Sequence, residues 1–230
     1  MNGARSTLLK KSAALASALV LGACASGPKP ADWQVEAAGA MERSVAAYLE
    51  GNARVEAAEL ARARSQLSRT GRADLLATAE LLHCASRVAS LVFEPCPGFE
   101  PLRLDATPAQ RAYAAYLQGQ VPAEAIALLP EAQRAPARGA ADALKGIADP
   151  LSRLLAAGVL LQTGRATPAV ITQAIDTASA RGWRRPLLAW LGVQLQRAEL
   201  GGDAEGAAAL RRRIAIAQGV GSLDTAKDKR

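Results

Sequence analysis

Cysteine and histidine are the residues of this chain best suited to nucleophilic or metal chemistry, and both are scarce. The 230-residue sequence contains three cysteines, Cys24, Cys84 and Cys96, and a single histidine, His83. Neighbours in sequence do not face each other on a helix, so His83 and Cys84 make a geometrically poor catalytic dyad. We interpret His83 as a partly buried structural residue. With one histidine and few other soft ligands, no metal site is expected.

Other catalytic motifs are missing from the sequence. It has no G-x-S-x-G elbow and no G-x-x-x-x-G-K phosphate loop. Glu56 and Glu59 are three residues apart on an expected helix, within reach of Arg54 or Arg62. Such spacing is typical of surface ion pairs rather than of glycoside hydrolysis, which needs an acid placed in a cleft. We therefore expect no catalytic residues, no cofactor and no enzymatic activity.

The N-terminal residues have the layout of an export signal. Basic residues precede an apolar run at 12–20, which is too short to span a bilayer. The sequence Leu21-Gly22-Ala23-Cys24 resembles the bacterial lipobox. This resemblance implies cleavage after residue 23 and acylation of Cys24. Because Ala25 rather than Asp follows, it also implies the outer membrane, on the periplasmic face.

We accordingly divide the chain into four parts. Residues 1–23 are the expected signal peptide, 24–31 the lipidated cysteine and flexible tether, 32–219 an α-helical repeat-like domain, and 220–230 a disordered tail. Pro28 and Pro30 prevent a helix in the tether, which reaches at most about 25 Å when extended. The anchor would therefore hold the folded domain close to the membrane.

Export also changes what is expected of the two remaining cysteines. In an oxidising compartment Cys84 and Cys96 form an even pair that can close a disulfide, with free thiols as the alternative. The closed loop is short, and a disulfide of this span stabilises a fold by about 3 kcal/mol.

The composition favours an all-α fold. Half of the residues are apolar but only 3% are aromatic, so alanine and leucine must form the core. Alanine permits close helix–helix approach, whereas a β-sandwich would need more β-branched and aromatic residues. The formal net charge of +7 includes three positive charges in the expected signal. The remaining charge is modest and does not indicate nucleic acid as a partner.

Start and stop signals divide residues 32–219 into helices. Thr-Pro or Asp-Pro pairs mark starts at 107–108, 149–150 and 167–168, and glycines mark most of the stops. The apolar residues recur every three or four positions, which is typical of helices with one buried stripe. The expected helices begin at 32, 53, 72, 108, 150, 168, 186 and 203 and stop near 51, 69, 91, 119, 164, 182, 201 and 219, with weaker ones at 122–134 and 136–148.

A short pattern repeats along the chain. Residues 46–51 (AAYLEG), followed by Glu56-Ala57, recur as 114–119 (AAYLQG), followed by Glu124-Ala125. The offset of 68 residues is twice the tetratricopeptide period of about 34. The chain thus resembles a divergent tetratricopeptide-type α-solenoid, without the regular Trp and Pro signature positions. The resemblance implies stacked helical hairpins that cover one another's apolar faces; a compact helical bundle is the alternative.

Four aromatic residues and two arginine clusters are candidates for contact with a partner. The aromatic candidates are Tyr48, Tyr116, Trp183 and Trp190, with core packing as the other interpretation of the two tryptophans. The arginine clusters are Arg62, Arg64, Arg69 and Arg72, and Arg211 to Arg213. These arginines are interpreted as exposed helix faces, with anionic headgroups or an acidic partner as the functional alternative.

The functional expectation follows from the anchor and the fold resemblance. Lipoproteins of this kind bind a protein or peptide partner during envelope assembly, secretion or pilus biogenesis. The resemblance thus implies a membrane-anchored helical scaffold that binds an envelope protein and no nucleic acid. The alternatives are a peptidoglycan-active enzyme or its regulator, and a purely structural envelope protein.

Overall fold

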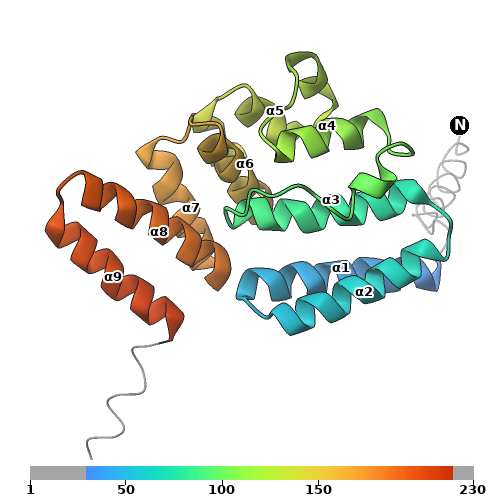
Figure 1. Ribbon diagram of the computed structural model, residues 1–230, viewed down its shortest axis with the longest axis horizontal. Coiled ribbons are helices and arrows are strands. Elements are labelled where there is room, and N and C mark those ends of the chain that lie inside the picture. The colour runs from blue at the N-terminus through green and yellow to red at the C-terminus, as the bar shows by residue number, and fades with distance from the viewer. Residues whose placement is uncertain (1–29, 220–230) are drawn as a thin grey trace, which may run out of the picture. The chain divides into compact units, whose positions relative to one another are not determined.

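The computed structural model describes residues 30–219, and within this range the chain is entirely helical, with no residue in a strand (Figure 1). The expected all-α fold class is therefore confirmed. The expected signal peptide, the acylation site Cys24 with most of the tether, and the expected tail lie outside the described residues.

The helices follow one another with short connections. The α-helices are α1 (Asp32–Glu50), α2 (Ala53–Ser68), α3 (Ala73–Ala89), α4 (Pro108–Leu117), α5 (Glu131–Ala137), α6 (Pro150–Gln162), α7 (Pro168–Ala180), α8 (Arg184–Leu200) and α9 (Ala204–Gln218). Short 3₁₀ helices are η1 (Glu100–Leu102), η2 (Ala123–Leu128) and η3 (Ala141–Gly146).

The predicted helix starts are confirmed by the geometry of their caps. The side chains of Thr107, Asp149, Thr167 and Asp203 each accept a hydrogen bond from a backbone N–H in the first turn of the following helix. Each such cap stabilises its helix by about 1 kcal/mol. The starts of α4, α6, α7 and α9 are therefore fixed by residues that the sequence makes visible.

The segment between α4 and α6 differs from the prediction. In place of helices at 122–134 and 136–148, it forms η2, the short helix α5, and η3. Pro122 and Pro130 adopt extended backbone with ψ of 148° and 141°, and each directly precedes a new element, η2 and α5 respectively. Pro136 lies inside α5 instead of starting a helix. Likewise α8 begins at Arg184, two residues before Pro186.

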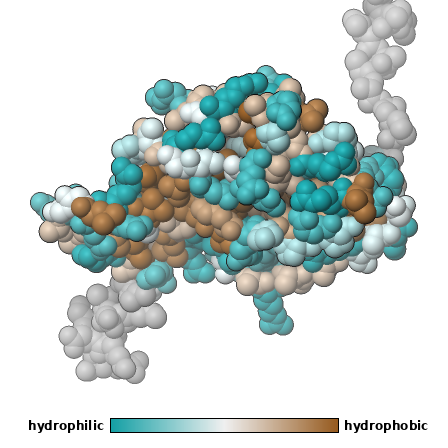
Figure 2. All heavy atoms as spheres, turned by 45° about the horizontal axis from the view of Figure 1, so that its top comes forward, coloured by the Kyte–Doolittle hydropathy of each residue, from teal (hydrophilic) through white to brown (hydrophobic). Residues whose placement is uncertain are grey.

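Helix α3 is central to the packing. It contributes buried residues to three apolar clusters: one with α4 and the segment that follows α3, one with α6, α7 and α8, and one with α1 and α2. Figure 1 shows α3 running between the α1–α2 pair and α4. Partly buried apolar side chains such as Leu187 and Val193 border the second cluster. Figure 2 shows apolar surface over this part of the molecule.

The repeated sequence pattern adopts the same turn at both positions but not the same second helix. Gly51 and Gly119 have φ of 89° and 70°, the left-handed region that glycine reaches most easily. The second segment is the α-helix α2 in the first copy and only η2 in the second. The alanines that follow the two turns also differ, because Ala57 is exposed whereas Ala125 packs against the first cluster.

Candidate partner-binding groove

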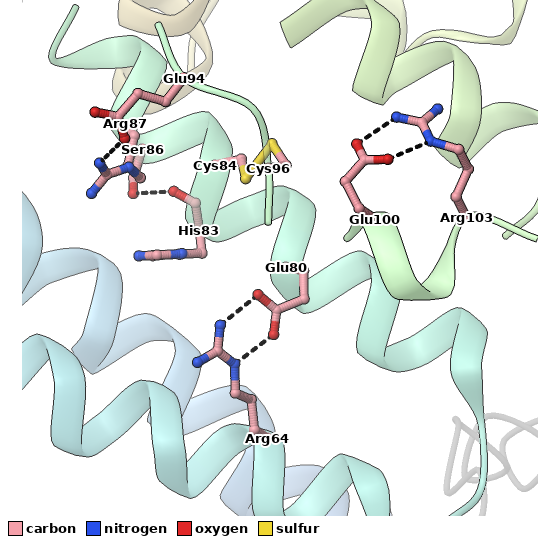
Figure 3. Close-up of a disulfide and its surroundings, with 10 residues drawn as sticks. All are labelled: Arg64, Glu80, His83, Cys84, Ser86, Arg87, Glu94, Cys96, Glu100 and Arg103. Carbon is pink, nitrogen blue, oxygen red and sulfur yellow. Dashed lines mark hydrogen bonds and ion pairs between the residues drawn. A yellow bond between two sulfur atoms is a disulfide. The ribbon is translucent and has the colours of Figure 1, made fainter. Parts of the chain in front are cut away.

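The residues that could do chemistry are engaged in structural contacts. His83 Nε2 lies 3.0 Å from Glu56 Oε1, which joins α3 to α2. Cys84 and Cys96 form a disulfide, as predicted, with their Cα atoms 5.8 Å apart. The side chains of His83 and Cys84 point in different directions from α3 (Figure 3). The two residues therefore do not form a nucleophile–base pair.

The expectation that Tyr48 and Tyr116 contact a partner is wrong, and of the two interpretations of Trp190 the structure confirms core packing. All three are fully buried, because their bulk fills space in a core that is rich in alanine and leucine. The Tyr116 hydroxyl donates to Gln133 Oε1 at 2.7 Å, and Trp190 Nε1 donates to the carbonyl oxygen of Ala89 at 3.2 Å. Trp183 is half-buried beside the second cluster, and the Arg181 guanidinium lies 5.3 Å from its ring centre.

The first arginine cluster consists of side chains that already have partners. Arg62 lies near Glu59, Arg69 contacts Gln66, and Arg72 pairs with Asp74. Arg64 forms two hydrogen bonds to the buried carboxylate of Glu80, one of them 2.7 Å long (Figure 3). Of the second cluster, Arg211 pairs with Glu199. These contacts support the structural interpretation of the first cluster.

The surface features best suited to binding are two apolar hollows on the same side of α3. They have volumes of about 520 and 480 Å³ and share Thr78 and Leu82 of α3. We call the two hollows together the α3 groove. The first hollow is bounded by α3, α4 and η2, and the second by α1, the end of α2, and α3. The lining residues are Leu81, Ala109, Gln110, Tyr113, Leu128, Leu129 and Pro130 in the first hollow, and Trp33, Gln34, Ala37, Ala38, Met41, Leu67, Arg72, Leu75 and Ala79 in the second.

The polar side chains between and beside the hollows bond to one another. The Thr78 hydroxyl donates to the carbonyl oxygen of Asp74 at 2.9 Å. Gln110 Nε2 donates to the same carbonyl oxygen at 2.7 Å and to Thr78 Oγ1 at 2.9 Å. Gln110 Oε1 accepts from the backbone N–H of Thr107. Because these atoms are already bonded, they offer little to a ligand, and the groove presents mainly apolar surface.

Tyr113 is the polar side chain of the first hollow whose hydroxyl remains available. Burial raises the pKa of Tyr113 far above its ordinary value, so the phenol stays protonated under all ordinary conditions. Within residues 30–219 its hydroxyl has no hydrogen-bond partner. It can therefore donate to a ligand atom placed in the hollow.

Leucine pairs explain why the groove is apolar. Leu81 and Leu129 are buried in the first cluster, whereas their neighbours Leu82 and Leu128 are 36% and 46% exposed. Adjacent side chains project in different directions, so where an element is covered on one side only one leucine of the pair is buried. Leu82 therefore lies on the groove. The partly exposed leucine of each pair supplies apolar surface to the groove.

Comparison of the chain with known protein families, with curated proteins and with solved structures found no match. Across residues 30–219, no helix is both long and apolar enough to cross a membrane.

Proposed function

We propose that the protein is a lipid-anchored helical scaffold, without enzymatic activity, that uses the α3 groove to bind a protein or peptide partner. Cys24 would carry the anchor at the periplasmic face of the outer membrane. The domain would act as an irregular tetratricopeptide-like solenoid in envelope assembly, secretion or pilus biogenesis. The observation that carries the binding role is the α3 groove, with its partly exposed leucines and internally bonded polar groups.

The physical basis of the proposal is the apolar surface of the groove. Covering one exposed leucine side chain removes apolar area from water and contributes up to about 2 kcal/mol. Leu82 stands between the two hollows, and Leu128 borders the first. Because the groove is formed by packed helices, little conformational entropy is lost when it is filled.

A scaffold role also agrees with how the potentially reactive residues are used. His83 ties α3 to α2, and the disulfide ties Cys96 to α3. The buried carboxylate of Glu80, the kind of group an acid catalyst needs, is bonded twice by Arg64. Paired in this way, these side chains hold segments of the fold together.

The test is affinity capture from the membranes of cells that express the wild-type chain, Leu82→Glu or Leu104→Glu. Leu104 is 94% exposed and does not line the groove, so it is a matched control for the same substitution. We expect an envelope protein that is captured by the wild type and by Leu104→Glu, and that is lost with Leu82→Glu. The proposal fails if both variants capture the same proteins as the wild type.

The anchor is tested separately with Cys24→Ala. This variant should move from the membrane fraction to the soluble fraction, because the acyl chains provide the proposed attachment. If Cys24→Ala stays in the membrane fraction, the assignment of Cys24 as the anchor is wrong.

A further inference from the structure

The form of the α3 groove restricts what can fill it. The two hollows lie on either side of a ridge formed by Thr78 and Leu82, which are one turn apart on α3. The groove is thus two adjacent receptacles rather than one tunnel. Separate receptacles suit side chains that project from one backbone at regular spacing. Both hollows are open to water along their exposed leucines, so an acyl chain lying there would remain half-solvated.

The backbone of the occupant must satisfy its own hydrogen bonds. The groove is formed by helices, whose backbone groups are already bonded, and residues 30–219 offer no strand edge. Thr78 and Gln110 are bonded to each other and to α3. An extended peptide would therefore lose the hydration of its N–H and C=O groups without replacement, which is unfavourable. A helix has no such need, because its backbone groups bond within the helix.

The charge of the residues that line the groove also restricts which face of a partner helix can bind there. Arg72, at the second hollow, is the lining residue with a charge, and Asp74 accepts hydrogen bonds from its Nε and Nη2 atoms at 2.8 and 2.6 Å. A charged partner face would thus be desolvated without finding an unpaired countercharge. The complement of this lining is an uncharged apolar stripe.

From these observations, and resting on the proposed function, we infer that the partner is an amphipathic helix. Its apolar side chains at positions such as i, i+4 and i+7 fill the two hollows across the Leu82 ridge. Beside the apolar side chain that fills the first hollow, a polar atom of the partner helix accepts a hydrogen bond from the Tyr113 hydroxyl, which has no partner within residues 30–219. Tyr113 thereby makes the groove prefer helices that carry a hydrogen-bond acceptor at this position.

The inference is tested with designed probe peptides and the full chain carrying Cys24→Ala. The first probe is a fluorescein-labelled helical peptide of Ala, Glu and Lys with Leu at i, i+4, i+7 and i+11. The control probe has the same composition with the leucines spread around the helix. Fluorescence anisotropy should show at least about tenfold tighter binding of the striped peptide, since tenfold corresponds to about 1.4 kcal/mol, less than one leucine burial.

Protein variants then locate the binding. Leu82→Glu should weaken the striped peptide at least about tenfold, while Leu104→Glu should leave its affinity unchanged. Tyr113→Phe keeps the ring and removes only the hydroxyl. It should weaken by about threefold to tenfold a striped peptide with Gln beside the first Leu, and leave the version with Ala there unaffected. Circular dichroism of each variant checks that the fold is intact.

Three results would overturn the inference. One is equal affinity for the striped and the spread peptides. Another is displacement of the striped peptide by palmitate at lower concentration than unlabelled peptide, which would identify the groove as an acyl-chain site. The third is a concentration-dependent dimer that Leu82→Glu abolishes and Leu104→Glu does not, which would identify a second copy as the occupant. If the peptide test fails but the capture from membranes succeeds, the inference of a helical partner is rejected and the proposed binding role of the groove remains.

Discussion

At the scale of residues, burial distinguishes ion pairs that matter for stability from those that do not. Glu80 is 3% exposed and depends on Arg64 for both of its hydrogen bonds, whereas Glu100 and Arg103 form an exposed pair. Arg103 holds the pKa of Glu100 below its ordinary value. That pair therefore contributes stability above the ordinary pKa and loses it as pH falls through the lowered pKa. Such exposed pairs contribute about 1 kcal/mol or less.

We predict that Arg64→Ala lowers the free energy of unfolding at pH 7 by about 2 kcal/mol, because it leaves a buried carboxylate unpaired. Arg103→Ala, which breaks the exposed pair, should lower it by less than about 1 kcal/mol. Urea unfolding followed by circular dichroism measures both. Equal losses in the two variants would contradict the importance given to the burial of Glu80.

The sequence predicted part of this residue-scale chemistry. The pairing of Arg62 with Glu59 and the disulfide both follow from spacing and compartment, and the structure confirms them. The Arg64–Glu80 pair could not be singled out, because carboxylates are abundant and only the packing of α2 on α3 shows which one is buried. Burial of Tyr48 and Tyr116 was missed for the same reason, since the type of a residue does not tell which face the fold covers. Core packing of Trp190 was one of the two interpretations of that residue, and the structure confirms it.

At the scale of elements, close helix contact depends on small residues. An added Cβ at Gly158 of α6 would lie 2.5 Å from the carbonyl oxygen of Val88 on α3. Gly192, inside α8, has no atom within 4 Å of such a Cβ. The two glycines occupy helix interiors but differ in their surroundings. Replacing each of them with alanine therefore separates the effect of helix packing on stability from the effect of helix propensity.

We predict that Gly158→Ala lowers the free energy of unfolding by about 1–3 kcal/mol, because α3 and α6 must move apart. Gly192→Ala should raise it by up to about 1 kcal/mol, because alanine favours the helix and meets no obstacle. Thermal and urea unfolding of the two variants measure these changes. A gain of stability in Gly158→Ala would show that the α3–α6 contact is looser than described.

The boundaries of helices were predictable where a capping residue in the local sequence marks them. Thr107, Asp149, Thr167 and Asp203 announce the helices that follow, and these starts are confirmed. Residues 122–148 were predicted wrongly, because their prolines interrupt the segment more often than a long helix allows. The α3 groove could not be predicted, because it forms only when residues of five elements, α1, α2, α3, α4 and η2, pack together.

At the scale of the whole molecule, a few long-range contacts connect the ends of the helical unit. Arg185, at the start of α8, donates through Nε to the carbonyl oxygen of Tyr48 at 2.8 Å, and its guanidinium lies 4.2 Å from the ring centre of Tyr48. This contact brings α8 to the end of α1. Together with the three clusters that share α3, it favours a groove of fixed form.

The central claim is that the α3 groove is covered by a partner in the cell. Its most direct measurement is site-specific photo-cross-linking in intact cells, with a photoreactive amino acid at position 82 or 128 and controls at positions 104 and 200. Leu104 and Leu200 are more exposed than the groove leucines, so accessibility alone favours the controls. We predict that positions 82 and 128 cross-link to the same envelope protein and that positions 104 and 200 do not. Equal labelling at all four positions, or none at 82 and 128, would contradict the claim.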